Sequence, residues 1–293
     1  MIYYSGTVEL LDQIYKRCVP PDLPYFEMLD RVHQHLVPRT YVEIGVSTGR
    51  SFTQALPGTR CIGIDPNPNL LFAKVRGSSI FTETSDDFFE KRKLASLLGG
   101  VPLDLAFIDG MHLFEFALRD FINLERASNP ETTILIHDCL PVSEATAERE
   151  RATDLWSGDV WRLIVLLRQW RPDLEVAVVD WAPTGVGVVR GLDPESKVLG
   201  DNYDEIVAQY LAMPYSALDD GTMGEQLHRV PGNWPTVEAL LPRRPFRSDN
   251  LDLLKVRRLV SAVPSAVSLA VGRSSRRANA APGRTTQAEP GAA

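Results

Sequence analysis

Cysteine is scarce in this 293-residue sequence, and positive charge is in the minority. The three cysteines are few and odd in number, and Cys61 and Cys139 lie in apolar, strand-like runs, so we expect buried thiols in a reducing, cytoplasmic location rather than disulfides. Lys and Arg total 31 against 38 Asp and Glu, a net charge of −7. This acidic balance argues against nucleic acid as the main partner.

Long apolar runs are also missing. No segment approaches the roughly 20 apolar residues of a membrane-spanning helix, so we expect no integral membrane segment. The first six residues lack the basic and apolar regions of a signal peptide. The most apolar late stretch, 259–271, is interrupted by Pro264, and we interpret it as a docked terminal helix before a disordered tail that begins at Arg273.

Apolar runs and helical patterns alternate from residue 40 to 180, which is typical of a parallel sheet covered by helices. Only Trp181-Ala182-Pro183-Thr184 separates the last two predicted strands, which is too short for a parallel crossover, so one of them must run in reverse. We predict helices at 7–18, 24–36, 112–127, 157–170 and 202–212, and strands at 40–45, 60–65, 78–82, 103–108, 132–137, 174–180 and 185–190.

The pattern Glu43-x-Gly45-x-x-x-Gly49 follows the first predicted strand and is expected to open a helix, and Asp65 ends the second strand. Glycines let the backbone approach a ligand, and an acid at the next strand tip can accept hydrogen bonds from ribose hydroxyls. The middle glycine of the dinucleotide fingerprint is missing. A carboxylate beside the turn repels pyrophosphate but attracts ammonium, which favours S-adenosylmethionine.

Two further strand tips carry polar residues: Asp109-Gly110-Met111-His112 and His137-Asp138. The carboxyl ends of strands in an open α/β sheet share one crevice, so these side chains should meet beside the glycine turn. Asp109, His137 and Asp138 offer oxygen and nitrogen ligands for a divalent cation, and His112 is positioned to take a proton. Singly, each could be a turn or cap residue; as a set they favour a functional site.

Together these motifs resemble class I S-adenosylmethionine-dependent methyltransferases, and the closer likeness is to macrolide sugar O-methyltransferases and cephalosporin-hydroxylase-like proteins. The resemblance covers about residues 35–190 and implies a Rossmann-like, doubly wound α/β sheet of seven strands with the last one antiparallel. That branch often has an acidic residue where His137 stands. The resemblance implies these roles: Glu43, Gly45 and Gly49 at the methionine end, Asp65 at the ribose, Ser85 and Asp86 beside the adenine, Asp109, His137 and Asp138 on Mg²⁺, and His112 as general base.

We divide the chain into four segments: a helical cap at 1–38, the methyltransferase domain at 39–192, an extension at 193–272 and a disordered tail at 273–293. The expected acceptor is a hydroxyl of a small molecule such as a sugar, with Trp156, Asp159 and Arg162 as candidate contacts. A homo-oligomer is compatible with the sequence.

Three other functions compete. Asp109, His112 and His137 could form the iron site of a non-haem oxygenase. A nicotinamide-dependent oxidoreductase is disfavoured by the missing glycine, and a catalytically inactive scaffold would need neither His112 nor Asp109.

Overall fold

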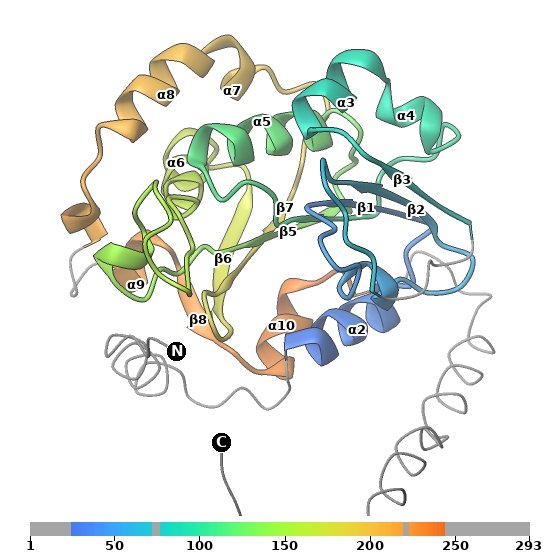
Figure 1. Ribbon diagram of the computed structural model, residues 1–293, viewed down its shortest axis with the longest axis horizontal. Coiled ribbons are helices and arrows are strands. Elements are labelled where there is room, and N and C mark those ends of the chain that lie inside the picture. Colours follow the sequence, from blue (N-terminus) through green and yellow to red (C-terminus); the bar gives the residue numbers. More distant parts are fainter. Residues whose placement is uncertain (1–24, 72–76, 219–222, 244–293) are drawn as a thin grey trace, which may run out of the picture. The chain divides into compact units, whose positions relative to one another are not determined.

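The computed structural model describes residues 25–71, 77–218 and 223–243 (Figure 1). The chain divides into two compact units, Met1–Asn250 and Leu251–Ala293, and only the first contains described residues. The predicted helix at 7–18, the apolar stretch at 259–271, the tail from Arg273 and Cys18 lie outside the described residues.

A single mostly parallel sheet organises the first unit, in the strand order β3-β2-β1-β4-β5-β7-β6-β8. Strand β7 is antiparallel to both neighbours, β5 and β6, as the short connection between the last two predicted strands required. The strands are β1 (Thr40–Ile44), β2 (Arg60–Ile64), β3 (Ser78–Phe81), β4 (Leu105–Ile108), β5 (Thr133–His137), β6 (Glu175–Asp180), β7 (Val186–Arg190) and β8 (Arg229–Pro231).

Helices cover both faces of this sheet (Figure 1). The face under α3, α5, α6 and α8 buries one apolar cluster, and the face under α2 and α10 buries a second. The helices are α2 (Tyr25–Leu36), α3 (Ser85–Lys91), α4 (Leu94–Leu97), α5 (Phe114–Glu125), α6 (Trp161–Trp170), α7 (Val198–Asp201), α8 (Tyr203–Leu211), α9 (Met223–Gln226) and α10 (Trp234–Leu240), with 3₁₀ turns η1 (Phe52–Gln54), η2 (Glu144–Thr146) and η3 (Tyr215–Leu218).

The doubly wound α/β fold and all seven predicted strands are confirmed, and the sheet gains an eighth strand that sequence patterns did not indicate. Strand β8 is three residues long and pairs in parallel with β6 at the sheet edge. It contains Pro231, and proline is tolerated at an edge strand because its missing N–H removes no bond from an interior ladder. So short a strand carries too little alternation to be recognised from sequence.

Two local predictions were wrong. The glycine turn opens no α-helix but only the 3₁₀ turn η1, because Ala55 is already extended and Pro57 and Gly58 follow. The helix predicted at 157–170 begins only at Trp161, and Ser157 lies buried before it and donates to the carbonyl of Thr146.

Cys61 and Cys139 are buried, as predicted. A helix with the length and apolarity needed to span a bilayer does not occur in the part of the chain that the structure describes.

Glu43 is fully buried within β1, on the face covered by α2. Its two carboxyl oxygens accept hydrogen bonds from the hydroxyls of Tyr41, at 2.5 Å, and Ser51, at 2.6 Å. Burial raises the pKa of Glu43 to about 8, although both hydroxyls act to lower it. This carboxyl is therefore a structural group that prefers its protonated form.

The raised pKa predicts how Glu43 affects stability. Between the ordinary carboxyl pKa of about 4.3 and the folded value of about 8, the folded state binds more protons than the unfolded state, so this group lowers stability as pH rises. Glu43→Gln should remove that contribution, and the unfolding free energy of the variant relative to the natural protein should increase from acidic to mildly alkaline pH. Urea unfolding across this range measures it.

The exposed Glu131→Gln serves as the matched control and should track the natural protein at every pH. Parallel curves for Glu43→Gln and the natural protein would contradict the assignment of a protonated Glu43.

Candidate functional site

The tips of β1, β2, β4 and β5 surround a pocket of about 380 Å³. On one side it is lined by the glycine turn and the second strand tip, with Gly45, Ser47 and Asp65. On the other side it is lined by Asp109, His112, His137 and Asp138. The nucleoside motif and the predicted cation cluster therefore share one pocket.

Gly45 joins the two sides. It has φ +88°, and a Cβ added there would lie 1.9 Å from the carbonyl oxygen of Asp109. This position therefore has no room for any side chain. The amide of Asp109 in turn donates to the carbonyl of Ile44 at 2.8 Å. The need for glycine at this position thus comes from the neighbouring strand tip as well as from any ligand.

Asp65 organises the turn from the other strand. Its carboxylate oxygens accept from the amides of Ser47 and Asn67, both at 2.7 Å, and the residue is 8% exposed at the pocket wall. Each carboxylate oxygen has a second lone pair, so both can accept a further hydrogen bond. Gly49, with φ +82°, lies under Leu70 and closes the turn.

Four predicted cofactor residues do not line this pocket: Glu43, Gly49, Ser85 and Asp86. The carboxyl group of Glu43 lies beneath the turn and accepts hydrogen bonds from the hydroxyls of Tyr41 and Ser51. Asp86 accepts hydrogen bonds from Nε and Nη2 of Arg119, both at 2.7 Å, and Ser85 lies at the start of α3 after β3. That helix start lies near the Asp65 tip, because the amide of Asp65 donates to the carbonyl of Phe81.

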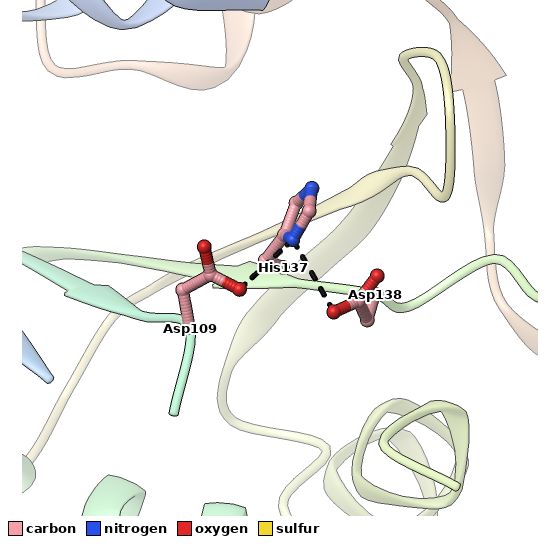
Figure 2. Close-up of side chains that lie close together, drawn as sticks. All are labelled: Asp109, His137 and Asp138. Atoms are coloured by element: carbon pink, nitrogen blue, oxygen red, sulfur yellow. Dashed lines mark hydrogen bonds and ion pairs between the residues drawn. The ribbon is translucent and has the colours of Figure 1, made fainter. Parts of the chain in front are cut away.

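The residues of the predicted cation cluster do meet (Figure 2). His137 Nδ1 lies 2.9 Å from Asp109 Oδ1 and 3.3 Å from Asp138 Oδ2, and one ligand atom from each residue falls within 4.8 Å of the others. Asp138 Oδ2 is buried and has no hydrogen-bond donor of good geometry. An unsatisfied buried carboxylate oxygen facing a second carboxylate and an imidazole fits a bound cation.

The charges in this cluster stabilise one another. Burial alone would raise the pKa of Asp109, but His137 and His112 overcome it and hold that pKa below its ordinary value. Burial alone would lower the pKa of His137, but Asp109 and Asp138 raise it well above the ordinary value. The site therefore favours positive charge held between two carboxylates.

His112 faces the same two acids from the loop before α5. Its Nδ1 lies 3.0 Å from Asp138 Oδ2 and 3.2 Å from the carbonyl oxygen of Trp156, and its Nε2 lies 3.4 Å from Asp109 Oδ1. The imidazole stacks on the indole of Trp156, with the ring centroids 5.2 Å apart. Burial lowers its pKa, but Asp109 and Asp138 reverse that effect and the pKa is raised. The two acids thus make the imidazole of His112 hold a proton more strongly than a free imidazole does.

Backbone strain concentrates at these tips. Ser47, His112 and Asp138 all adopt φ between 48° and 61°, the left-handed region that residues other than glycine occupy uncommonly, although Asp and His do so more often than Ser. Such conformations persist where the surrounding structure enforces them, and they often mark functional sites.

Two of the expected acceptor contacts prove structural. Asp159 is fully buried and accepts from the amide of Phe114 and from Arg149 and Arg162, so neither it nor Arg162 is presented to a substrate. Trp156 does line the pocket. Arg151, Asp154 and Thr184 also line it and were missed, because nothing in the chain spacing indicates that their loops reach the strand tips.

The chain is similar to proteins of known fold and family. Residues 42–139 match a family model described as a methyltransferase domain. A comparison with curated protein sequences finds no match.

Solved structures with a similar fold include an O-methyltransferase from Bacillus cereus in complex with SAH, with 16% identity, coverage of 65% of this chain and 92% of that one, and a TM-score of 0.40. The O-methyltransferase TomG from Streptomyces achromogenes, in complex with SAM, has 14% identity, coverage of 66% and 92%, and a TM-score of 0.44. Cofactor-bound Rv0187 from MTB has 16% identity, coverage of 64% and 90%, and a TM-score of 0.44.

These likenesses are too distant to carry an argument about the substrate. The family match rests on the same strands and motifs as the resemblance seen in the sequence. Residues 42–139 are thus similar to a methyltransferase domain, in agreement with the resemblance seen in the sequence.

Proposed function

We propose that this protein transfers a methyl group from S-adenosylmethionine to a hydroxyl of a small molecule such as a sugar, assisted by a divalent cation. One observation carries the proposal: Asp65, which suits a ribose, and the cluster of Asp109, His137 and Asp138 line the same pocket as His112. Methyl transfer is an in-line displacement, so the donor and the acceptor oxygen must lie side by side.

The donor half rests on Asp65. Its two oxygens keep lone pairs for the ribose hydroxyls while the amides of Ser47 and Asn67 fix its orientation. Gly45 and Gly49 let the turn approach the methionine end, and Glu43 supports that turn from below through Ser51. Ser85 and Asp86 remain our proposal for the adenine end, since α3 begins beside the Asp65 strand tip.

The acceptor half rests on proton removal. A sugar hydroxyl is a weak acid, and a divalent cation held by Asp109, His137 and Asp138 would supply Lewis acidity that lowers the pKa of a nearby hydroxyl. His112 takes the proton at the nitrogen that faces the cluster, Nε2, because its Nδ1 hydrogen is directed to the carbonyl of Trp156. The stacked Trp156 ring holds the imidazole and offers an apolar surface for a sugar.

The oxygenase alternative would use His112 in place of Asp138 as a metal ligand. Asp138 Oδ2, however, is the buried atom that lacks a hydrogen-bond donor and faces the cluster. An oxygenase would also leave Asp65 and the methyltransferase-domain match without a role.

Asp65→Ala tests the donor half. Loss of two hydrogen bonds to a charged group, each worth about 1.5 kcal/mol or more, should weaken binding of S-adenosylhomocysteine by about 100-fold or more in calorimetric titration. Cation binding by the same variant should match the natural protein, which shows that the pocket is still folded. Absence of binding heat for the natural protein would overturn the proposal.

His112→Ala tests the acceptor half. Label transfer from methyl-labelled S-adenosylmethionine in a screen of hydroxylated acceptors should fall by about 10²–10⁴-fold, because the general base is lost. Affinity for S-adenosylhomocysteine should stay unchanged. Equal label transfer by the variant would remove His112 from the mechanism while leaving the methyltransferase assignment intact.

A further inference from the structure

We propose that Asp109, His137 and Asp138 bind a first-row transition dication, such as Mn²⁺ or Co²⁺, in preference to Mg²⁺. The inference deepens the proposed function, because it names the class of cation taken by the same site. It depends on the proposed methyl transfer for its purpose, but the binding itself can be tested without S-adenosylmethionine or an acceptor.

The separations suit ligands that share one ion. Two ligand atoms about 2.1 Å from a common cation, at right or tetrahedral angles, lie roughly 3.0–3.4 Å apart. His137 Nδ1 is 2.9 Å from Asp109 Oδ1 and 3.3 Å from Asp138 Oδ2. Figure 2 shows this nitrogen turned toward both carboxylates and the other ring nitrogen turned away from them.

Hydrogen bonds alone do not satisfy this cluster. His137 Nδ1 carries at most one hydrogen, and its hydrogen bond is to Asp109 Oδ1. His112 Nδ1 lies 3.0 Å from Asp138 Oδ2, but its hydrogen bond of good geometry is with the carbonyl of Trp156 at 3.2 Å. The buried Oδ2 of Asp138, whose side chain is 4% exposed, therefore has two imidazoles at ion-pair distance but no hydrogen bond of good geometry. A cation between these atoms would satisfy it.

The donor types decide the class of cation. Mg²⁺ prefers an octahedral shell of oxygens and gives up its water reluctantly, whereas imidazole nitrogen favours transition dications. His137 supplies one nitrogen to the cluster, and His112 Nε2 lies 3.4 Å from Asp109 Oδ1 as a second nitrogen beside the site. Because His137 offers a nitrogen ligand and not an oxygen, the site should prefer a transition dication over Mg²⁺.

The experiment is calorimetric titration of chelator-treated, full-length protein with MnCl₂, CoCl₂ and MgCl₂. Mn²⁺ and Co²⁺ should bind at least about tenfold more tightly than Mg²⁺, as expected for a site that contains nitrogen. The visible absorption of bound Co²⁺ gives a second readout, since its bands report nitrogen ligation.

Three variants locate the effect. His137→Asp should reduce the preference for Mn²⁺ over Mg²⁺ to near parity, and His137→Gln, which is neutral and of similar size, should lose tight Co²⁺ binding if the Asp variant fails to fold. Asp138→Asn should weaken both cations. Glu131→Gln changes an exposed carboxylate outside the pocket, and it should leave all affinities unchanged.

Three results would overturn the inference: Mg²⁺ binding as tightly as Mn²⁺, no cation binding, or a preference that survives unchanged in both His137 variants. Titration of the same sample with S-adenosylhomocysteine separates the two proposals. Transition-metal preference without nucleoside binding upholds this inference and overturns the methyltransfer proposal, whereas nucleoside binding with Mg²⁺ preferred does the reverse.

Discussion

The site depends on how closely two adjacent strand tips approach. With no side chain at Gly45, the peptide after β4 can pass directly over the turn after β1, where even a Cβ would lie 1.9 Å from the carbonyl of Asp109. The amide of Asp109 bonded to Ile44 fixes this contact. Because the two tips are locked together, the side chain that suits a ribose and the side chains that suit a cation face one pocket.

The distribution of charged groups explains why that pocket suits a cation. Asp109 and Asp138 lie within hydrogen-bonding or ion-pair distance of both His112 and His137, and the histidine pKa values are raised as a result. Two carboxylates in a mostly buried site repel each other unless positive charge lies between them. The left-handed backbone at His112 and Asp138 brings these groups together.

An ion-pair network centred on the buried Asp159 holds the backbone of His112 in place. Asp159 accepts from Arg149 and Arg162 and also from the amide of Phe114 at the start of α5. The carbonyl of His112 accepts from the amide of Asp159, and a Cβ at Gly158 would meet that same carbonyl at 1.9 Å. The loop that carries Trp156 is thereby tied to the loop that carries His112, which fixes the imidazole without a contact from Asp159 to the pocket.

Much of this architecture followed from sequence alone. Apolar runs that alternate along the chain with helical patterns predicted the seven strands. Strands of a parallel sheet are buried on both faces and therefore need continuous apolar segments. The four residues between β6 and β7 required the reversed strand, and the polar residues at the ends of β4 and β5 indicated a site at the carboxyl edge.

Tertiary contacts decided the rest. Glu43 looked like a ligand contact but lies under the turn, bonded to Tyr41 and Ser51, since strand alternation points it away from the pocket. The sequence suggested Asp159 as a substrate contact, but its carboxylate accepts hydrogen bonds from Arg149 and Arg162 instead. The reach of Thr184 and Arg151 to the pocket, and the missing donor at Asp138 Oδ2, depend on how separate loops pack. Sequence spacing specifies which residues end a strand, whereas only packing determines which of their atoms are left without a partner.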